Sequence, residues 1–132
     1  MLEADEILVE VEVPLLTASK AGAYRKESIR AGDRPIASVA AVVALDGGGK
    51  MVKEARIVLG GVGMTPIRAR EAERVITGKE EEESILEETG VVAAREARPT
   101  ADVEGSVEYK REIVRLLTKE MVDLAIKRAQ AR

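Results

Sequence analysis

Three segments in the N-terminal half have the hydrophobic pattern of β-strands. In 7–13, apolar residues alternate with glutamates and one leucine, and this period of two predicts a strand with one buried face that ends at Pro14. Segment 37–45 is almost continuously apolar, as expected of a strand covered on both faces. Three glycines in 46–50 then supply turn chemistry, so we predict a hairpin into an antiparallel third strand over 52–59.

The stretch between the first two predicted strands has no periodicity. Residues 15–32 mix small, polar and basic residues, which predicts a long loop with Tyr24 near a short strand or turn. Loops of this length in small domains are often functional.

The second half changes to helical spacing. We predict a first helix with Thr65 as N-cap and Pro66 as its first residue, ending at Gly78. A second helix begins in the acidic run 80–83, which favours a helix N-terminus, and Gly90 interrupts it. The predicted inner faces are Ala69, Ala72, Val75 and Ile76 in the first helix, and Ile85, Leu86 and Val91 or Val92 in the second.

A long third helix follows Pro99, with Ser106 as its predicted N-cap. Its apolar stripe is Ile113, Leu116, Leu117, Met121, Leu124 and Ala125. Its basic residues Lys110, Arg111, Arg115 and Lys119 alternate with glutamates at ion-pair spacings, which indicates a solvated face. Three strands followed by three helices predict an α+β sandwich, an antiparallel three-stranded sheet packed on a layer of about three helices. We expect residues 1–132 to form a single domain.

The amino-acid composition argues against several classes of ligand and catalytic site. The 132 residues are 45% hydrophobic, with no Phe, no Trp and two Tyr, so the core must be aliphatic and stacking on nucleic acid bases is not expected. A net charge of −3 also argues against a nucleic acid partner. Without Cys or His, we expect no metal site and no catalytic residue of the usual kinds. No secretory signal or membrane-spanning run is present, so we expect a cytoplasmic protein without membrane association.

Two segments could bind a ligand. The glycine turn 60–63 lies between a strand and a helix, but it lacks the third glycine of dinucleotide-binding turns, which favours a structural bend over a nucleotide site. In 24–33, the charged residues Arg25, Lys26, Arg30 and Asp33 crowd together on a loop. From the residues alone a solvated basic loop is favoured over a binding loop, because exposed charge is the norm.

Several segments together, in this order and spacing, resemble the C-terminal domain of the flavoprotein (medium) subunit of molybdenum hydroxylases, the carbon monoxide dehydrogenase and xanthine dehydrogenase group. They are 5–14, 24–33, 34–46, 55–73 and 102–111. In this resemblance 5–14 is the strand leaving the FAD-binding domain, 24–33 is the flavin-facing loop, and 102–111 begins the last helix. Members carry a larger FAD-binding domain before this one, which we expect to be absent here, leaving a split subunit or an excised domain.

The resemblance implies a component that is not catalytic alone. It would complete the FAD site and mediate subunit assembly, supporting electron transfer from iron-sulfur clusters to FAD. The implied partners are an FAD-binding domain or subunit, an iron-sulfur subunit and a molybdopterin subunit. FAD would be held only together with the separate FAD-binding domain, with no cofactor bound by this chain alone. The substrate stays open among carbon monoxide, purines, aldehydes and aromatic acyl thioesters.

The resemblance also assigns roles within the loop. Arg25 and Lys26 would lie nearest the flavin, and Arg30 and Asp33 would hold the loop in shape. A cation there would stabilise negative charge on the reduced ring. Many relatives place a basic pair where this sequence has Ile29 and Arg30. The resemblance therefore implies one cationic contact fewer.

An alternative function needs no flavin. Related α+β folds serve as dimerisation domains, so the chain could be an autonomous homo-oligomerisation or protein-interaction module that uses its helix layer or an exposed sheet edge.

Overall fold

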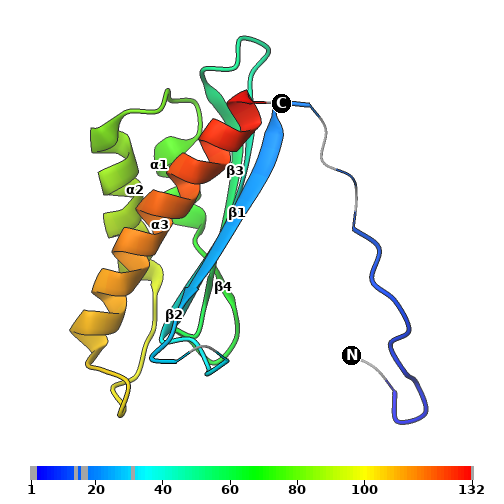
Figure 1. The fold of residues 1–132 in the computed structure, drawn as a ribbon, viewed down its shortest axis with the longest axis vertical. Helices are drawn as coiled ribbons and strands as arrows, with labels where there is room; N and C mark the ends of the chain where they lie inside the picture. Colours follow the sequence, from blue (N-terminus) through cyan, green and yellow to red (C-terminus); the bar gives the residue numbers. More distant parts are fainter. Residues whose placement is uncertain (1–2, 14, 16–17, 31, 132) are drawn as a thin grey trace.

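The computed structural model describes residues 3–13, 15, 18–30 and 32–131, and in this part the chain forms a sheet with helices on one side (Figure 1). The antiparallel sheet has the order β1-β2-β3-β4, with β1 (Lys20–Glu27), β2 (Ala37–Leu45), β3 (Val52–Gly60) and β4 (Ile67–Arg68). The helices are α1 (Arg70–Ile76), α2 (Glu83–Glu96) and α3 (Val107–Gln130). The predicted α+β class is confirmed, with four described strands instead of three.

The strand predicted over 7–13 is wrong. Residues 3–13 contain no strand, and the side chains of Ile7 and Val9 are 84% and 88% exposed. A strand requires a hydrogen-bonding neighbour, and this segment pairs with none of the described strands. Pro14, its predicted end, lies outside the described residues.

The long loop predicted over 15–32 is wrong at 20–27, where β1 (Lys20–Glu27) runs, and the short strand or turn expected near Tyr24 is this eight-residue strand. Residues 16, 17 and 31 of that loop lie outside the described part. Strand β1 pairs along its whole length with β2, and only the small Ala21 and Ala23 are buried. Two alanines give too weak a hydrophobic alternation to reveal a strand.

Strand β2 was expected to be covered on both faces, and only one face is. Val39, Ala41 and Val43 are buried toward the helices, whereas Ala40 and Val42 on the other face are half-buried. The continuous run of small apolar residues is instead explained by the position of β2 inside the sheet, with β1 on one side and β3 on the other. No described element covers its outer face (Figure 1).

The hairpin from β2 to β3 is confirmed. Gly49 has a φ of +69°, a conformation that glycine adopts without steric cost. The carboxylate of Asp46 accepts hydrogen bonds from the backbone N–H groups of Lys50 at 3.0 Å and Met51 at 3.1 Å. These backbone donors hold the pKa of Asp46 below its usual value.

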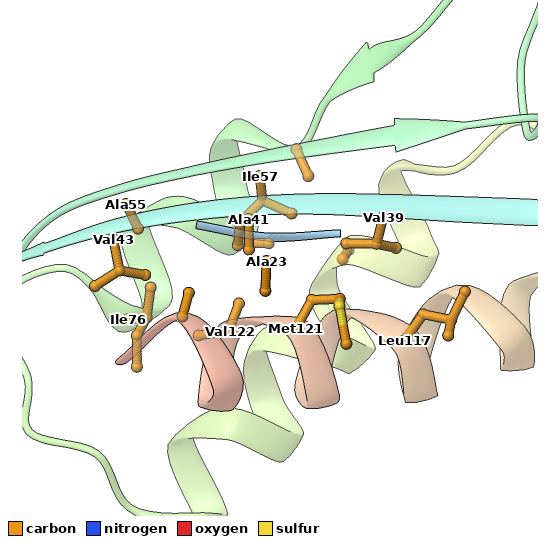
Figure 2. Packing of buried hydrophobic residues seen from close by; sticks show 14 of the residues in the cluster. Ala23, Val39, Ala41, Val43, Ala55, Ile57, Ile76, Leu117, Met121 and Val122 are labelled. Carbon is orange, nitrogen blue, oxygen red and sulfur yellow. The ribbon is translucent and has the colours of Figure 1, made fainter. Parts of the chain in front are cut away.

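The core is aliphatic, as composition predicts. Figure 2 shows Val39, Ala41 and Val43 of β2 facing Leu117 and Met121 of α3 across a layer without aromatic rings. Both tyrosines lie on the surface, Tyr24 at 63% exposed and Tyr109 at 47%. Helix α3 packs on β1 and β2, α1 packs on β3, and α2 covers α1 and α3.

The first helix begins later than predicted. Ile67 and Arg68 pair with β3 as β4, and α1 begins at Arg70 with Ala69 as N-cap, so Thr65 does not cap it. Residues 67–68 instead pair with Val58 and Leu59 of β3, so the backbone groups of β3 gain hydrogen-bond partners that a helix at 66–68 would not supply. Gly78, with a φ of +79°, follows the C-cap as predicted.

Helix α2 is not interrupted at Gly90. A Cβ at Gly90 would lie 2.6 Å from the carbonyl oxygen of Arg115 on α3. The glycine therefore permits a close helix crossing, for which the absence of a side chain is required. Leu86 is buried on the inner face as expected, whereas Ile85, Val91 and Val92 are half-buried.

Helix α3 begins as predicted. The hydroxyl of Ser106 accepts a hydrogen bond from the backbone N–H of Tyr109 at 3.1 Å. Leu117, Met121 and Ala125 are buried, but Leu116 of the predicted stripe is exposed.

Removing this cap is a direct test of the helix start. We expect Ser106→Ala to lower the free energy of unfolding by about 1 kcal/mol, because one N–H of the first turn loses its acceptor. Thr65→Ala is the matched control, and it should change stability by less than about 0.5 kcal/mol because Thr65 caps no helix. Urea unfolding followed by far-UV circular dichroism measures both, and equal losses would contradict the assignment.

The two edges of the sheet are protected in different ways. Beyond β4, the Ile57 N–H donates to the carboxylate of Glu73 at 2.9 Å, and the Ile57 carbonyl accepts from the Ala69 N–H at 2.9 Å. On the β1 edge, Arg128 of α3 donates to the carbonyl of Gly22 at 2.9 Å. Two side chains and one backbone N–H thus satisfy strand groups that would otherwise attract another strand.

Candidate functional site

The candidate site is the turn that joins β1 to β2. The Ile36 N–H donates to the Glu27 carbonyl at 2.8 Å and closes the turn. Inside it, the Asp33 N–H donates to the Arg30 carbonyl at 3.2 Å. Lys26 Nζ donates to the Asp33 carbonyl at 3.2 Å. Two backbone hydrogen bonds and the Lys26 side chain therefore hold the turn, while the side chains of Lys26, Arg30 and Asp33 are exposed.

Arg25 and Lys26 do not converge. They are neighbours on a strand, so their side chains point to opposite faces of the sheet. Arg25 lies on the helix side, where its Nη1 donates to both carboxylate oxygens of Glu120 on α3 at 2.7 and 2.9 Å. The structure brings Lys26 and Asp33 together and leaves Arg25 in an ion pair that ties β1 to α3. The flavin roles of the four residues stay predictions.

The glycine turn 60–63 packs closely against neighbouring residues on the side where side chains would lie. A Cβ at Gly61 would lie 2.8 Å from the carbonyl oxygen of Pro35, and one at Gly63 would lie 2.7 Å from the Ile67 side chain. Gly61 also has a φ of +75°, and Val62 is fully buried. These contacts agree with a structural bend that packs against the start of β2.

Lys110 contradicts the solvated face predicted for α3. Only 3% of its side chain is exposed, and its Nζ lies 2.6 Å from the Asp102 carboxylate. This hydrogen bond is the main reason that the pKa of Asp102 is lowered. The two residues are eight positions apart across a turn, and no local spacing rule would have paired them. Arg115 and Lys119 also reach α2, where both pair with Glu87.

The part of the chain that the structure describes offers neither a clustered metal site nor a membrane-spanning helix. No three Asp, Glu, His or Cys side chains there are placed to share a metal ion. None of the described helices has both the length and the apolar composition to cross a bilayer.

The comparisons with known proteins agree with one another. The model of the family described as the CO dehydrogenase flavoprotein C-terminal domain matches residues 22–125. The glyceraldehyde dehydrogenase medium chain of Sulfolobus acidocaldarius is 34% identical over 113 residues, 86% of this chain and 39% of that protein. The carbon monoxide dehydrogenase medium chain of Afipia carboxidovorans is 30% identical over 129 residues, 98% of this chain and 44% of that one.

A solved structure of the carbon monoxide dehydrogenase from Hydrogenophaga pseudoflava, in a form lacking the Mo-pyranopterin moiety of its cofactor, has the same fold. It matches with a TM-score of 0.82 and 29% identity over 88% of this chain and 40% of that one. The chain thus spans about two fifths of the length of the relatives it matches. On this evidence the chain belongs to the family of CO dehydrogenase flavoprotein C-terminal domains.

Proposed function

We propose that this chain is a non-catalytic component of a molybdenum hydroxylase flavoprotein, which completes an FAD site held mainly by a separate FAD-binding domain. The observation that carries the proposal, beyond family membership, is the β1–β2 turn, which is closed by its own hydrogen bonds and leaves the side chains of Lys26 and Arg30 exposed. When bound, FAD would supply the electron-accepting ring. The Lys26 ammonium fits beside such a ring because a fixed cation stabilises negative charge that develops there.

The segment 7–13 supports docking to another domain. Its alternating apolar residues are exposed in this chain, and an apolar strand pattern without a partner indicates a missing neighbour. The proposed neighbour is the sheet of the FAD-binding domain. The further partners in this proposal are an iron-sulfur subunit and a molybdopterin subunit of a cytoplasmic complex.

We expect Lys26→Met to lower the midpoint potential of the flavin in a complex with the matching FAD-binding polypeptide. A loss of about 30 mV corresponds to about 1.4 kcal/mol for the two-electron couple. The reduced flavin is the form that loses stabilisation, because it carries the negative charge. Lys50→Met, at the hairpin at the other end of β2, is the matched control. Spectroelectrochemical titration measures both potentials, and equal values for Lys26→Met and the control would contradict the role of Lys26.

The assembly itself is tested in native cells. Affinity purification of the tagged chain should recover FAD-binding, iron-sulfur and molybdopterin polypeptides, with flavin and iron-sulfur absorption in the visible spectrum. A colourless chain without partners would overturn the proposal.

A second candidate function rests on the outer face of the sheet. Ala40 and Val42 are half-buried there and no described element covers them, so self-association through this face is the alternative. Sedimentation equilibrium distinguishes the two, because a monomer at all concentrations would exclude self-association.

A further inference from the structure

A cavity of about 290 Å³ lies among the glycine turn, the segment after α2 and the start of α3. Four of its lining side chains are charged, and two of its lining residues are glycines of the turn. They are Arg34, Arg98, Asp102 and Lys110, and Gly61 and Gly63. Pockets for drug-sized ligands begin at about 300 Å³, so this cavity suits a smaller ligand.

The charges in the cavity do not cancel. Asp102 is neutralised by Lys110, whose buried ammonium lies 2.6 Å from its carboxylate. The charge of Arg34 contributes as well to the lowered pKa of Asp102. Among the described residues, neither Arg34 nor Arg98 has a carboxylate within 4.0 Å. The cavity therefore has a net positive charge, which comes from the guanidinium groups of Arg34 and Arg98.

The backbone wall adds potential donors. The N–H groups of Gly61 and Gly63 donate to no backbone carbonyl of the residues that the structure describes. Gly61 and Gly63 line the cavity and have no side chains, so their backbone atoms form this part of the wall. Backbone N–H groups in irregular turns, together with arginines, are the usual donors to bound anions. Thr100 also lines the cavity and carries a hydroxyl donor.

We propose that this cavity binds a phosphate group, either as free phosphate or as the phosphate of a small monoester. Arg34 and Arg98 would each offer the planar pair of donors that matches phosphate oxygens, and the Lys110–Asp102 pair would hold the far wall in place. The inference goes beyond the proposed function, since none of these residues is assigned to the flavin and the site needs no FAD-binding domain.

The test is a titration of the isotope-labelled chain with inorganic phosphate and with AMP at constant ionic strength, followed by NMR. We expect saturable shifts at the amides of Gly61, Gly63 and Arg98. The double variant Arg34→Gln/Arg98→Gln should bind at least tenfold more weakly. Both arginines are exposed, so the fold should survive, and unchanged signals from the core would verify it. Arg111→Gln is the matched control, an exposed arginine near the start of α3 that does not line the cavity.

The outcomes separate the sources of the anion. Tighter binding of AMP than of phosphate would identify a monoester as the ligand, and saturation by phosphate alone would identify the free anion. Absence of saturation in the millimolar range, or equal binding by the double variant and the control, would overturn the proposal.

Discussion

Replacing Gly90 by alanine is expected to lower the free energy of unfolding by about 1–3 kcal/mol. In an ordinary helix the same change is stabilising by about 1 kcal/mol, because alanine is the better helix former. Here the new Cβ would lie 2.6 Å from the Arg115 carbonyl oxygen. This oxygen belongs to a backbone and cannot rotate away, so α2 and α3 would have to separate. Chemical denaturation measures the sign as well as the size.

Gly47→Ala provides the matched control for this prediction. Gly47 lies in the β2–β3 hairpin, and a Cβ built there meets no atom within 4 Å. We expect a change of less than about 0.5 kcal/mol for that variant. A stabilised Gly90→Ala protein would show that the two helices tolerate a wider crossing and would contradict the role assigned to this glycine.

The second large effect is expected at Glu73. Its carboxylate is almost completely buried, accepts the Ile57 N–H at 2.9 Å and also holds Arg68 at 2.8 and 2.9 Å. Glu73→Ala should lower the free energy of unfolding by about 1–3 kcal/mol, because the buried Ile57 N–H loses its acceptor. Hydrogen exchange at Ile57 reports this loss locally, and thermal unfolding reports it globally.

Two companion variants make the Glu73 prediction specific. Glu73→Gln keeps an oxygen for the Ile57 N–H, so it should lose less stability than Glu73→Ala. Glu71→Ala removes an exposed carboxylate from the same helix, and we expect a loss below about 1 kcal/mol. Equal losses for all three variants would show that Glu73 acts only as a charge in the first turn of α1.

The parts of the fold that could be predicted have strong local signals. The apolar run of β2, the glycines of the hairpin and the Ser106 cap each determine a structure within a few residues, and all three are confirmed. Strand β1 could not be predicted because Ala21 and Ala23 are its only buried residues and its stability comes from pairing with β2. The opposite error at 7–13 has a related cause, since a strand pattern says nothing about whether a partner strand is present.

The candidate sites depend even more on distant contacts. The sequence shows that Arg25 and Lys26 are adjacent cations, but only the structure shows that Arg25 pairs with Glu120 of α3 and that Lys26 contacts the Asp33 carbonyl. Glu73 and Lys110 occupy helix positions where a charged residue is normally solvated. Their burial follows from what lies opposite each of them, an unpaired strand N–H in one case and Asp102 in the other. No spacing rule contains that information.

The surface position of both tyrosines has a practical consequence for following this protein in solution. Without Trp, and with neither phenol ring in the core, ultraviolet emission should change little when the domain unfolds. Tyr24 projects from β1 just before the turn that we propose faces a flavin. A flavin brought close to it would quench its emission. Tyrosine fluorescence should therefore report the docking of a flavin-bearing partner while remaining almost silent about folding.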